Sequence, residues 1–294
     1  MKPAAFAYLS PDSLEEALDR LAQAGPEAKV IAGGQSLIPA MNFRILQPSL
    51  LIDLNRLTDL EFIRAHDGDG LRIGAMTRQR RLERDPQIRS LAPLLHEATP
   101  FVAHPQIRNR GTLGGSLAHA DPSAELPAVI LALEGRIRAR RAGGERWIKA
   151  ADFFQGMFAT ALGPDEIVTE VELPAPPQRT GWAFTEIARR TGDYALAGVA
   201  VGLTLDGRGV CTGARMVFLN AGDGPRVAME AAALLAGQSV TPDLFEAAAA
   251  QAVVEIDPPG NLHASPEFQR HLAGVLARRA LVRAHERALQ PRAD

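Results

Sequence analysis

The feature that most constrains this chain is a loop with three glycines in five residues, at Gly111, Gly114 and Gly115. Each glycine loses roughly 0.5 to 1 kcal/mol more on folding than alanine does, so a loop of this kind usually needs its backbone for a specific purpose. A second pair, Gly33 and Gly34, follows a short apolar strand predicted at residues 29–32. We therefore expect close backbone approach at two places in the fold.

The glycine pair suits a phosphate-binding loop. Two glycines after a strand permit positive φ, and the residues that follow can aim N–H groups at an anion from a helix start. An ordinary tight turn is the alternative, and it is about equally common. The pattern is neither a Rossmann nor a Walker fingerprint, so neither of those nucleotide-binding folds is implied.

The longer glycine run could clasp the same pyrophosphate from its other side. Thr112 and Ser116 add hydroxyl donors, and Glu125 could accept hydrogen bonds from ribose hydroxyls, as an acidic residue does in other dinucleotide sites. Arg108 and Arg110 could contact phosphate or could make ordinary solvated or subunit contacts, and the sequence favours neither interpretation. From the residues alone, a shared dinucleotide is one hypothesis beside a purely structural use of the glycines.

Periodicity and turn residues predict a mixed α+β layout up to residue 175. The predicted helices lie at residues 11–24, 87–98 and 124–133, and the predicted strands at residues 29–32 and 50–54. One predicted hairpin pairs residues 60–65 with 71–75 across the turn Asp67-Gly68-Asp69-Gly70, and another turns at Gly143-Gly144.

Pro174, Pro176 and Pro177 interrupt this pattern, because proline removes a ladder donor and fixes φ. We therefore predict a first domain at 1–175, with subdomains at about 1–57 and 58–175, and a second domain at 176–294. The second domain is expected to hold a three-stranded sheet followed by three helices. The strands are predicted at residues 181–189, 195–205 and 210–219, with a turn at 206–209, and the helices from Pro225, Pro242 and Pro266.

Composition excludes several classes of protein and site. A net charge of -2 without a long block of one sign offers nucleic acid no general attraction. The single cysteine, Cys211, excludes an intramolecular disulfide and any all-cysteine iron–sulfur or zinc site built by this chain alone. No apolar run reaches the roughly 18 residues of a membrane span, and residues 1–10 lack the apolar core of a signal peptide. We expect a cytoplasmic protein.

No residue is assigned a catalytic or metal-binding role. The chain shows no serine–histidine–acid spacing, metal-ligand spacing or paired-carboxylate motif. His104 and His119 flank the glycine run and are interpreted as loop hydrogen-bonding residues. The basic residues of the last helix are interpreted first as a solvated face and second as a partner-docking surface. They are Arg278, Arg279, Arg283 and Arg287.

Three motifs carry a resemblance to a known family. They are AGGQSLIPAMNFR at 32–44, RNRGTLGGSLAHADPSAELP at 108–127 and RRTGDYALAGVAV at 189–201. In this order they resemble the FAD-binding medium subunits of molybdenum hydroxylases, which include the medium subunit of aerobic carbon monoxide dehydrogenase and the flavin domain of xanthine dehydrogenase. The resemblance covers essentially the whole chain.

The resemblance implies a vanillyl-alcohol-oxidase/PCMH-type FAD-binding fold, in which two α+β subdomains hold FAD and a C-terminal unit completes the pocket. It also implies two pyrophosphate loops, an acidic residue at the adenosine ribose and an aromatic residue beside the isoalloxazine. The matching positions are Lys29, Ala32, Gly33, Gly34, Gln35, Ser36, Leu37, Thr112, Gly114, Gly115, Ser116, Glu125, Asp193 and Tyr194. Thr185 and Glu186 stand where some relatives carry a lysine near the flavin, so cationic support from that position is not expected.

The implied function is electron transfer without substrate oxidation by this chain. A small subunit with two [2Fe–2S] clusters and a large subunit with a molybdenum cofactor would join it in a dimer of heterotrimers. Electrons would reach noncovalently bound FAD from the clusters and leave to NAD⁺, a quinone or oxygen. The complex would act on carbon monoxide, an aromatic or N-heterocyclic compound, or an aldehyde.

Three alternatives predict different behaviour. A stand-alone FAD oxidase of the same fold would turn over a substrate by itself. A cofactor-free assembly subunit would show no flavin spectrum after gentle purification. A nicotinamide-only dehydrogenase would need a Rossmann fingerprint, which the sequence lacks.

Overall fold

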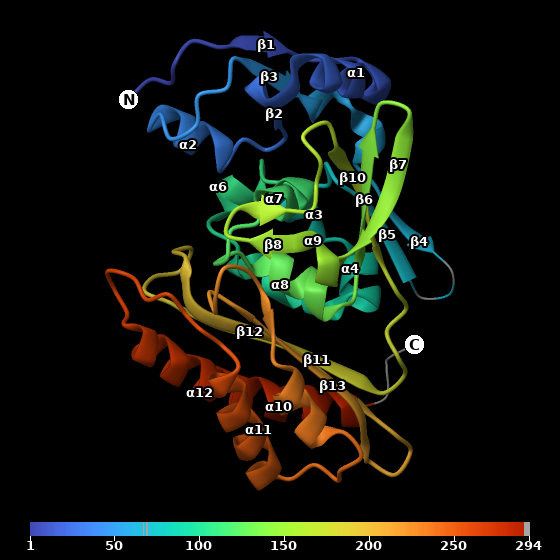
Figure 1. Cartoon of the computed structure of the whole chain (residues 1–294). Helices are drawn as coiled ribbons and strands as arrows, with labels where there is room; N and C mark the ends of the chain where they lie inside the picture. Colours follow the sequence, from blue (N-terminus) through green and yellow to red (C-terminus); the bar gives the residue numbers. More distant parts are fainter. Residues whose placement is uncertain (67, 69, 291–294) are drawn as a thin grey trace.

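The computed structural model describes residues 1–66, 68 and 70–290, and Figure 1 shows three units stacked in chain order. A small N-terminal sheet lies at the top, and a larger sheet with its surrounding helices lies in the middle. The C-terminal sheet and helix α12 lie at the bottom. The α+β, PCMH-type fold class is confirmed.

The N-terminal unit is a parallel sheet with strand order β1-β3-β2. Its elements are β1 (Ala7–Leu9), α1 (Leu14–Ala24), β2 (Ala28–Ile31), α2 (Leu37–Asn42) and β3 (Leu50–Asp53). Helix α1 begins later than predicted because Ser13 is its N-cap, accepting from the Glu16 N–H at 3.1 Å. The helix packs Ala17, Leu18 and Leu21 into one hydrophobic cluster with β2 and β3. The strand β1 is not among the predicted elements.

The middle unit holds a five-stranded antiparallel sheet with strand order β4-β5-β10-β6-β7. Its strands are β4 (Ile63–His66), β5 (Gly70–Gly74), β6 (Arg136–Arg141), β7 (Gly144–Lys149) and β10 (Ile167–Leu173). Both predicted hairpins are confirmed, since Ile63 pairs with Ile73 and Arg141 with Gly144. Asp67 and Asp69, from the first predicted turn, lie outside the described residues.

The central strand β10 is not among the predicted elements either. Every residue of it is buried, including Glu170 and Glu172. Arginines on the neighbouring strands neutralise these carboxylates: Arg136 Nη2 lies 2.6 Å from Glu172 and Arg138 Nη1 lies 3.0 Å from Glu170. Two buried glutamates in a central strand are tolerated here because each has a charged partner.

Short helices cover the middle unit. They are α3 (Gln79–Leu82), α4 (Pro86–Leu91), α5 (Pro93–Ala98), α6 (Pro105–Arg108), α7 (Leu113–His119), α8 (Glu125–Ala132) and α9 (Ala150–Phe153), followed by the small hairpin of β8 (Phe154–Gly156) and β9 (Ala159–Thr160). The helix predicted at residues 87–98 is two helices, α4 and α5. The division falls at Pro93, which takes the first position of α5 because proline lacks an N–H and suits a helix start.

The C-terminal sheet has four antiparallel strands, so the prediction of three is wrong by one. The strands are β11 (Thr180–Ala188), β12 (Ala195–Leu205), β13 (Cys211–Leu219) and β14 (Arg226–Val227). The added strand has only two residues, too few to give a periodic signal. The helices α10 (Met229–Leu235), α11 (Pro242–Val254) and α12 (Pro266–Leu289) follow, and α10 starts after Pro225 rather than at it.

The two faces of the C-terminal sheet enter different cores. Phe184, Ala200 and Val217 join the hydrophobic cluster that includes residues of α5 and α8. Ala183 and Val199 join the cluster formed with α10, α11 and α12. Because side chains alternate along a strand, this division fixes which residues of β11 and β12 point toward the middle unit.

Candidate flavin site

The glycine loop after β2 leaves its N–H groups free of protein acceptors. Gly34 has a φ of 70°, and the Gln35 side chain folds back so that its Nε2 donates to the Gly33 carbonyl oxygen at 3.0 Å. In the part of the chain that the structure describes, no protein oxygen accepts from the N–H groups of residues 33–36. Four consecutive free donors, with a glycine in the left-handed region among them, suit an anion.

The second glycine run uses its N–H groups within the protein. Thr112 is the N-cap of α7, and its Oγ1 accepts from the Gly115 N–H at 3.1 Å. The Leu113 N–H donates to the Thr77 carbonyl oxygen at 3.0 Å, and the Gly114 N–H to the Ala75 carbonyl oxygen at 2.8 Å. The first turn of α7 is therefore satisfied without a ligand, and the Thr112 and Ser116 hydroxyls remain as its possible contributions.

Gly114 itself is explained by packing. A Cβ at this position would lie 2.5 Å from the Ala75 Cβ, so only glycine lets α7 approach the end of β5 this closely. Gly114 and Thr112 are both buried.

The structure brings the two glycine loops into direct backbone contact. A Cβ on Gly33 would overlap the Arg110 carbonyl oxygen and would lie 2.7 Å from the Gly111 Cα. A Cβ on Gly115 would lie 3.7 Å from the Ala32 Cβ. The hypothesis that both loops hold one ligand requires them to lie close together, and this contact satisfies that requirement.

Two residues that the sequence did not single out tie these loops together. Arg78 donates through Nη1 to the Arg110 carbonyl oxygen at 2.5 Å and through Nη2 to Asn55 Oδ1 at 2.6 Å. Asn55 in turn donates through Nδ2 to the Ala32 carbonyl oxygen at 2.8 Å. Burial lowers the pKa of Arg78, with neighbouring Arg110 acting in the same direction. No motif or spacing marks Arg78 or Asn55, because they act through isolated hydrogen bonds.

The other positions that the resemblance assigns to the first loop lie on either side of Gly33 and Gly34. Lys29 is exposed on β2 and makes no ion pair among the described residues, and Ser36 is exposed just before α2. Ala32 packs partly against the core beneath α1, and Leu37 opens α2.

Glu125, Asp193 and Tyr194 form a second group. Glu125 is the first residue of α8 and is 7% exposed, whereas Tyr194 is 74% exposed in the loop before β12. Although most of the Tyr194 surface is exposed, partial desolvation of its phenol raises the pKa of Tyr194, and the carboxyls of Asp121 and Glu125 raise it further. The Glu125 carboxyl thus acts electrostatically on the Tyr194 phenol, although the resemblance implies an acidic residue at the adenosine ribose and an aromatic residue beside the isoalloxazine.

Asn220 connects the segment before Glu125 to the strand after Tyr194. The sequence analysis did not identify it. Its N–H donates to the Pro122 carbonyl oxygen at 2.7 Å, and its Nδ2 donates to the carbonyl oxygens of Ala195 and Leu196 at 2.9 and 3.1 Å. The residue is buried and has a φ of 51°, a conformation that asparagine tolerates better than most residues. Asn220 thereby fixes the segment before α8 against the strand that follows Tyr194.

Arg108 is a structural residue. The sequence alone left open whether it contacts phosphate or makes ordinary solvated or subunit contacts. It is 5% exposed and donates through Nε to Glu83 at 3.1 Å. Its Nη1 donates to three carbonyl oxygens, those of Pro100, Val102 and Ala103.

Two of the basic residues of the last helix make ion pairs within the chain. Arg283 and Arg287 of α12 both pair with Glu97 of α5.

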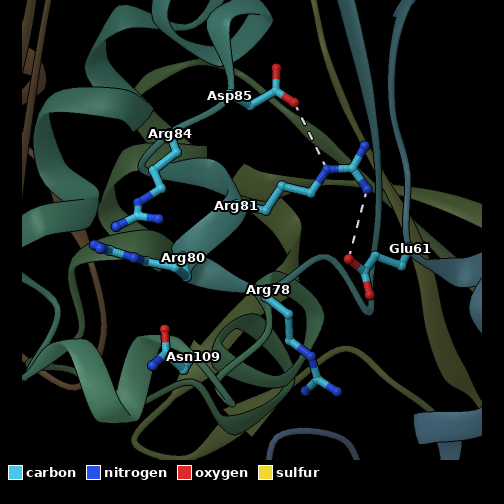
Figure 2. A pocket seen from close by; sticks show the side chains of 7 residues that line it. All are labelled: Glu61, Arg78, Arg80, Arg81, Arg84, Asp85 and Asn109. Atoms are coloured by element: carbon cyan, nitrogen blue, oxygen red, sulfur yellow. Dashed lines mark ion pairs between the residues drawn. The ribbon is translucent and has the colours of Figure 1, made fainter.

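A basic hollow of about 520 Å³ borders the contact between the loops (Figure 2). Its lining residues are Glu61, Arg78, Arg80, Arg81, Arg84, Asp85 and Asn109. Arg81 extends between Glu61 and Asp85, at 3.7 and 3.8 Å. None of these residues was predicted as a site residue.

Comparison with known proteins identifies the family. The family described as the FAD binding domain in molybdopterin dehydrogenase matches residues 4–176, and the CO dehydrogenase flavoprotein C-terminal domain matches residues 182–284. The chain belongs to the FAD-subunit family of the molybdenum hydroxylases. The resemblance drawn from the three motifs is confirmed, and the chain is a flavoprotein oxidoreductase subunit by family.

Similar proteins match this chain over nearly its full length. It is 43% identical to the 6-hydroxypseudooxynicotine dehydrogenase complex subunit alpha of Paenarthrobacter nicotinovorans, over 98% of this chain and 97% of that protein. It is 40% identical to the nicotine 6-hydroxylase medium subunit of the same organism, over 98% of this chain and 100% of that protein. A crystallised carbon monoxide dehydrogenase chain from Hydrogenophaga pseudoflava superposes with a TM-score of 0.94 at 38% identity, covering 98% of this chain and 99% of that chain.

Among the described residues, no helix combines the length and the apolar character needed to cross a bilayer.

Proposed function

We propose that this chain binds FAD noncovalently and relays electrons within a molybdenum hydroxylase complex. Electrons would enter from the [2Fe–2S] clusters of a small subunit and leave to an external acceptor. The substrate would be hydroxylated at a molybdenum cofactor in a large subunit, and the assembly would be a cytoplasmic dimer of heterotrimers.

The observation that carries this proposal is the row of four free N–H groups at residues 33–36. Backbone N–H groups around a left-handed glycine form a concave site for an anion, and the FAD diphosphate is the anion that the family supplies. The close contact of Gly33 with residues 110–111 holds this loop beside the backbone that leads into Thr112 and α7. The residues present therefore fit a diphosphate.

At the other end of the site, Asp193 and Tyr194 are proposed to flank the isoalloxazine. Because Glu125 acts electrostatically on the Tyr194 phenol, we propose that it borders the cofactor toward the flavin end, where the resemblance by itself implies the adenosine ribose. Lys29, Ala32 and Leu37 border the first loop. Bound FAD supplies the ability to hold one or two electrons, while the chain's own residues bind it, orient it and set the charge around it.

Two further assignments follow from this arrangement. We propose a domain division near residue 175, with the first domain contributing the diphosphate loops and the second contributing Tyr194. Since no residue of this chain is assigned to substrate, the substrate class of the complex is set by its large subunit. Relatives named for a nicotine derivative and for carbon monoxide make an N-heterocyclic compound or carbon monoxide suitable first candidates.

The test is native purification of the chain together with its companion chains, followed by visible spectra and metal analysis. We expect FAD, iron and molybdenum in one complex, and FAD released on denaturation. Substrate turnover by the purified single chain would instead indicate a stand-alone oxidase. A gently purified complex without a flavin spectrum would indicate an assembly subunit, and flavin retained on the denatured chain would contradict noncovalent binding.

A further inference from the structure

Glu186 is a partly buried residue, and one of its carboxyl oxygens is buried without a partner among the described residues. It lies on β11 two residues after Phe184, so both side chains point from the sheet face that meets α5 and α8. Its Oε2 is buried and has no hydrogen-bond partner within the described residues. Gly198 on β12 lies against it, since a Cβ there would be 3.0 Å from the Glu186 Cβ. The neighbouring strand thus limits where this carboxyl can move.

Glu125 is the first residue of α8, which packs against β12, the strand next to β11. Its side chain is 7% exposed and makes no ion pair or hydrogen bond to another side chain in the described structure. Arg108 is the cation that acts on it, but the Arg108 guanidinium already bonds to Glu83 and to three carbonyl oxygens. Neither Glu125 nor Glu186 therefore has a cation as a direct ion-pair partner in the part of the chain that the structure describes.

Desolvation and like charge act together on this pair. Burial is the main cause that raises the pKa of Glu186 to about 9, and the nearby Glu125 raises it further. Burial also raises the pKa of Glu125 to about 7, with Asp121 acting in the same direction and the Glu125 N–H and Arg108 opposing it. Two ionised carboxylates in this position would be both poorly solvated and mutually repulsive.

The pair adjoins the residue proposed to flank the flavin. Glu125 and Asp121 both act on the Tyr194 phenol. Asn220 connects the segment before α8 to Ala195, the residue after Tyr194, through bonds of 2.7 and 2.9 Å. Asn220 therefore ties the segment that precedes Glu125 to the strand that follows Tyr194.

We propose that Glu125 and Glu186 form a carboxyl pair that retains at least one proton at neutral pH in the wall of the flavin pocket and links flavin reduction to proton binding. The link to the flavin rests on the proposed function, whereas the proton-holding pair does not. Reduction adds negative charge to a flavin, which makes a neighbouring proton harder to remove. By reciprocity, protonation of the pair makes reduction more favourable.

Infrared difference spectroscopy of the full chain, with and without FAD, tests the pair directly. We expect the C=O band of a protonated carboxylic acid at pH 7, which is lost in Glu186→Gln and altered in Glu125→Gln. Glu246→Gln is the matched control, because Glu246 is an exposed glutamate on α11 and its removal should leave the band unchanged. A wild-type spectrum without this band, or a band unchanged in both Glu186→Gln and Glu125→Gln, would overturn the proposal.

The pH dependence of unfolding gives a second readout. The folded-state pKa of Glu186 lies above its unfolded value of 4.5, so its contribution to stability is complete below that value and is lost as the pH rises toward about 9. Between about pH 5 and about pH 9, the unfolding free energy should therefore fall less steeply in Glu186→Gln than in the wild type. An unchanged slope would count against the pair.

The link to the flavin is tested by its midpoint potential. In FAD-loaded protein we expect the potential to fall more steeply with pH in the wild type than in Glu186→Gln, from about pH 7 to about pH 9. Equal slopes would overturn the link. A chain that binds no FAD would refute the proposed function and the link with it, while the infrared band would still decide whether the pair exists.

Discussion

The glycine loop at residues 33–36 and the glycine run at residues 111–115 look alike in sequence. They differ in whether their backbone N–H groups have acceptors within the protein. The first loop leaves four of them without a protein acceptor, whereas residues 113–115 donate theirs to Thr77, Ala75 and Thr112. The second run needs glycine chiefly so that α7 can pack against the end of β5. Glycine density alone therefore does not separate a ligand cradle from a close-packed helix start. What separates them is the hydrogen bonding of the backbone.

Gly33→Ala should have the largest effect on FAD binding. The new Cβ would overlap the Arg110 carbonyl oxygen, so the two loops must separate and the free N–H groups lose their alignment. We expect the Kd for FAD to rise by about 100-fold, or roughly 2.7 kcal/mol. Isothermal titration of FAD-free protein measures this, with Gly213→Ala as the control because a Cβ there meets open space. Unchanged affinity would show that the loop contact does not shape the site.

Gly114→Ala should instead lower stability. Its Cβ would lie 2.5 Å from the Ala75 Cβ, so α7 must shift, and overpacking of this kind costs about 1 to 3 kcal/mol. The protein that remains folded should bind FAD with an affinity within about threefold of the wild type. Denaturant unfolding and FAD titration measure the two quantities. Weaker FAD binding at unchanged stability would mean that the second run holds the ligand through its backbone.

Arg78→Lys should weaken FAD binding without direct contact with the cofactor. A single ammonium group cannot reach both the Arg110 carbonyl oxygen and Asn55 Oδ1 in the geometry that the planar guanidinium provides. We expect an affinity loss of about tenfold. Arg84→Lys is the matched control, because Arg84 lines the same hollow and its side chain makes no hydrogen bond within the described residues. Equal effects of the two substitutions would argue that only the charge of the hollow matters.

Thr112→Val should have the smallest effect. It removes the cap that accepts from the Gly115 N–H, and loss of a threonine N-cap costs about 1 kcal/mol of unfolding free energy. Thr112→Ser keeps the hydroxyl and should stay near the wild-type value. If Thr112→Val weakens FAD binding far more than it lowers stability, the hydroxyl contacts the ligand as well as the helix.

The sequence predicted most of the long elements, because these depend on periodicity and on turn residues. The two hairpins of the middle unit and the three long strands after residue 180 are of this kind. The strand β10 escaped prediction because its charged residues, Glu170 and Glu172, are buried against arginines from neighbouring strands. Only the folded sheet brings those partners together.

The same limit applies to the site. Its glycine motifs were visible, and a dinucleotide shared by the two loops was one of the hypotheses that they left open. Arg78, Asn55 and Asn220 were not, because each acts through single hydrogen bonds to segments more than twenty positions away along the chain. Such bonds leave no local pattern, and only the three-dimensional arrangement reveals them.

The most direct test of the difference between the two loops is a crystal structure of the chain with FAD bound. We predict that diphosphate oxygens lie within hydrogen-bonding distance of the N–H groups of residues 33–36, while the N–H groups of residues 113–115 keep their bonds to Thr77, Ala75 and Thr112. Diphosphate oxygens on the N–H groups of residues 113–115, with residues 33–36 left without ligand, would contradict the account.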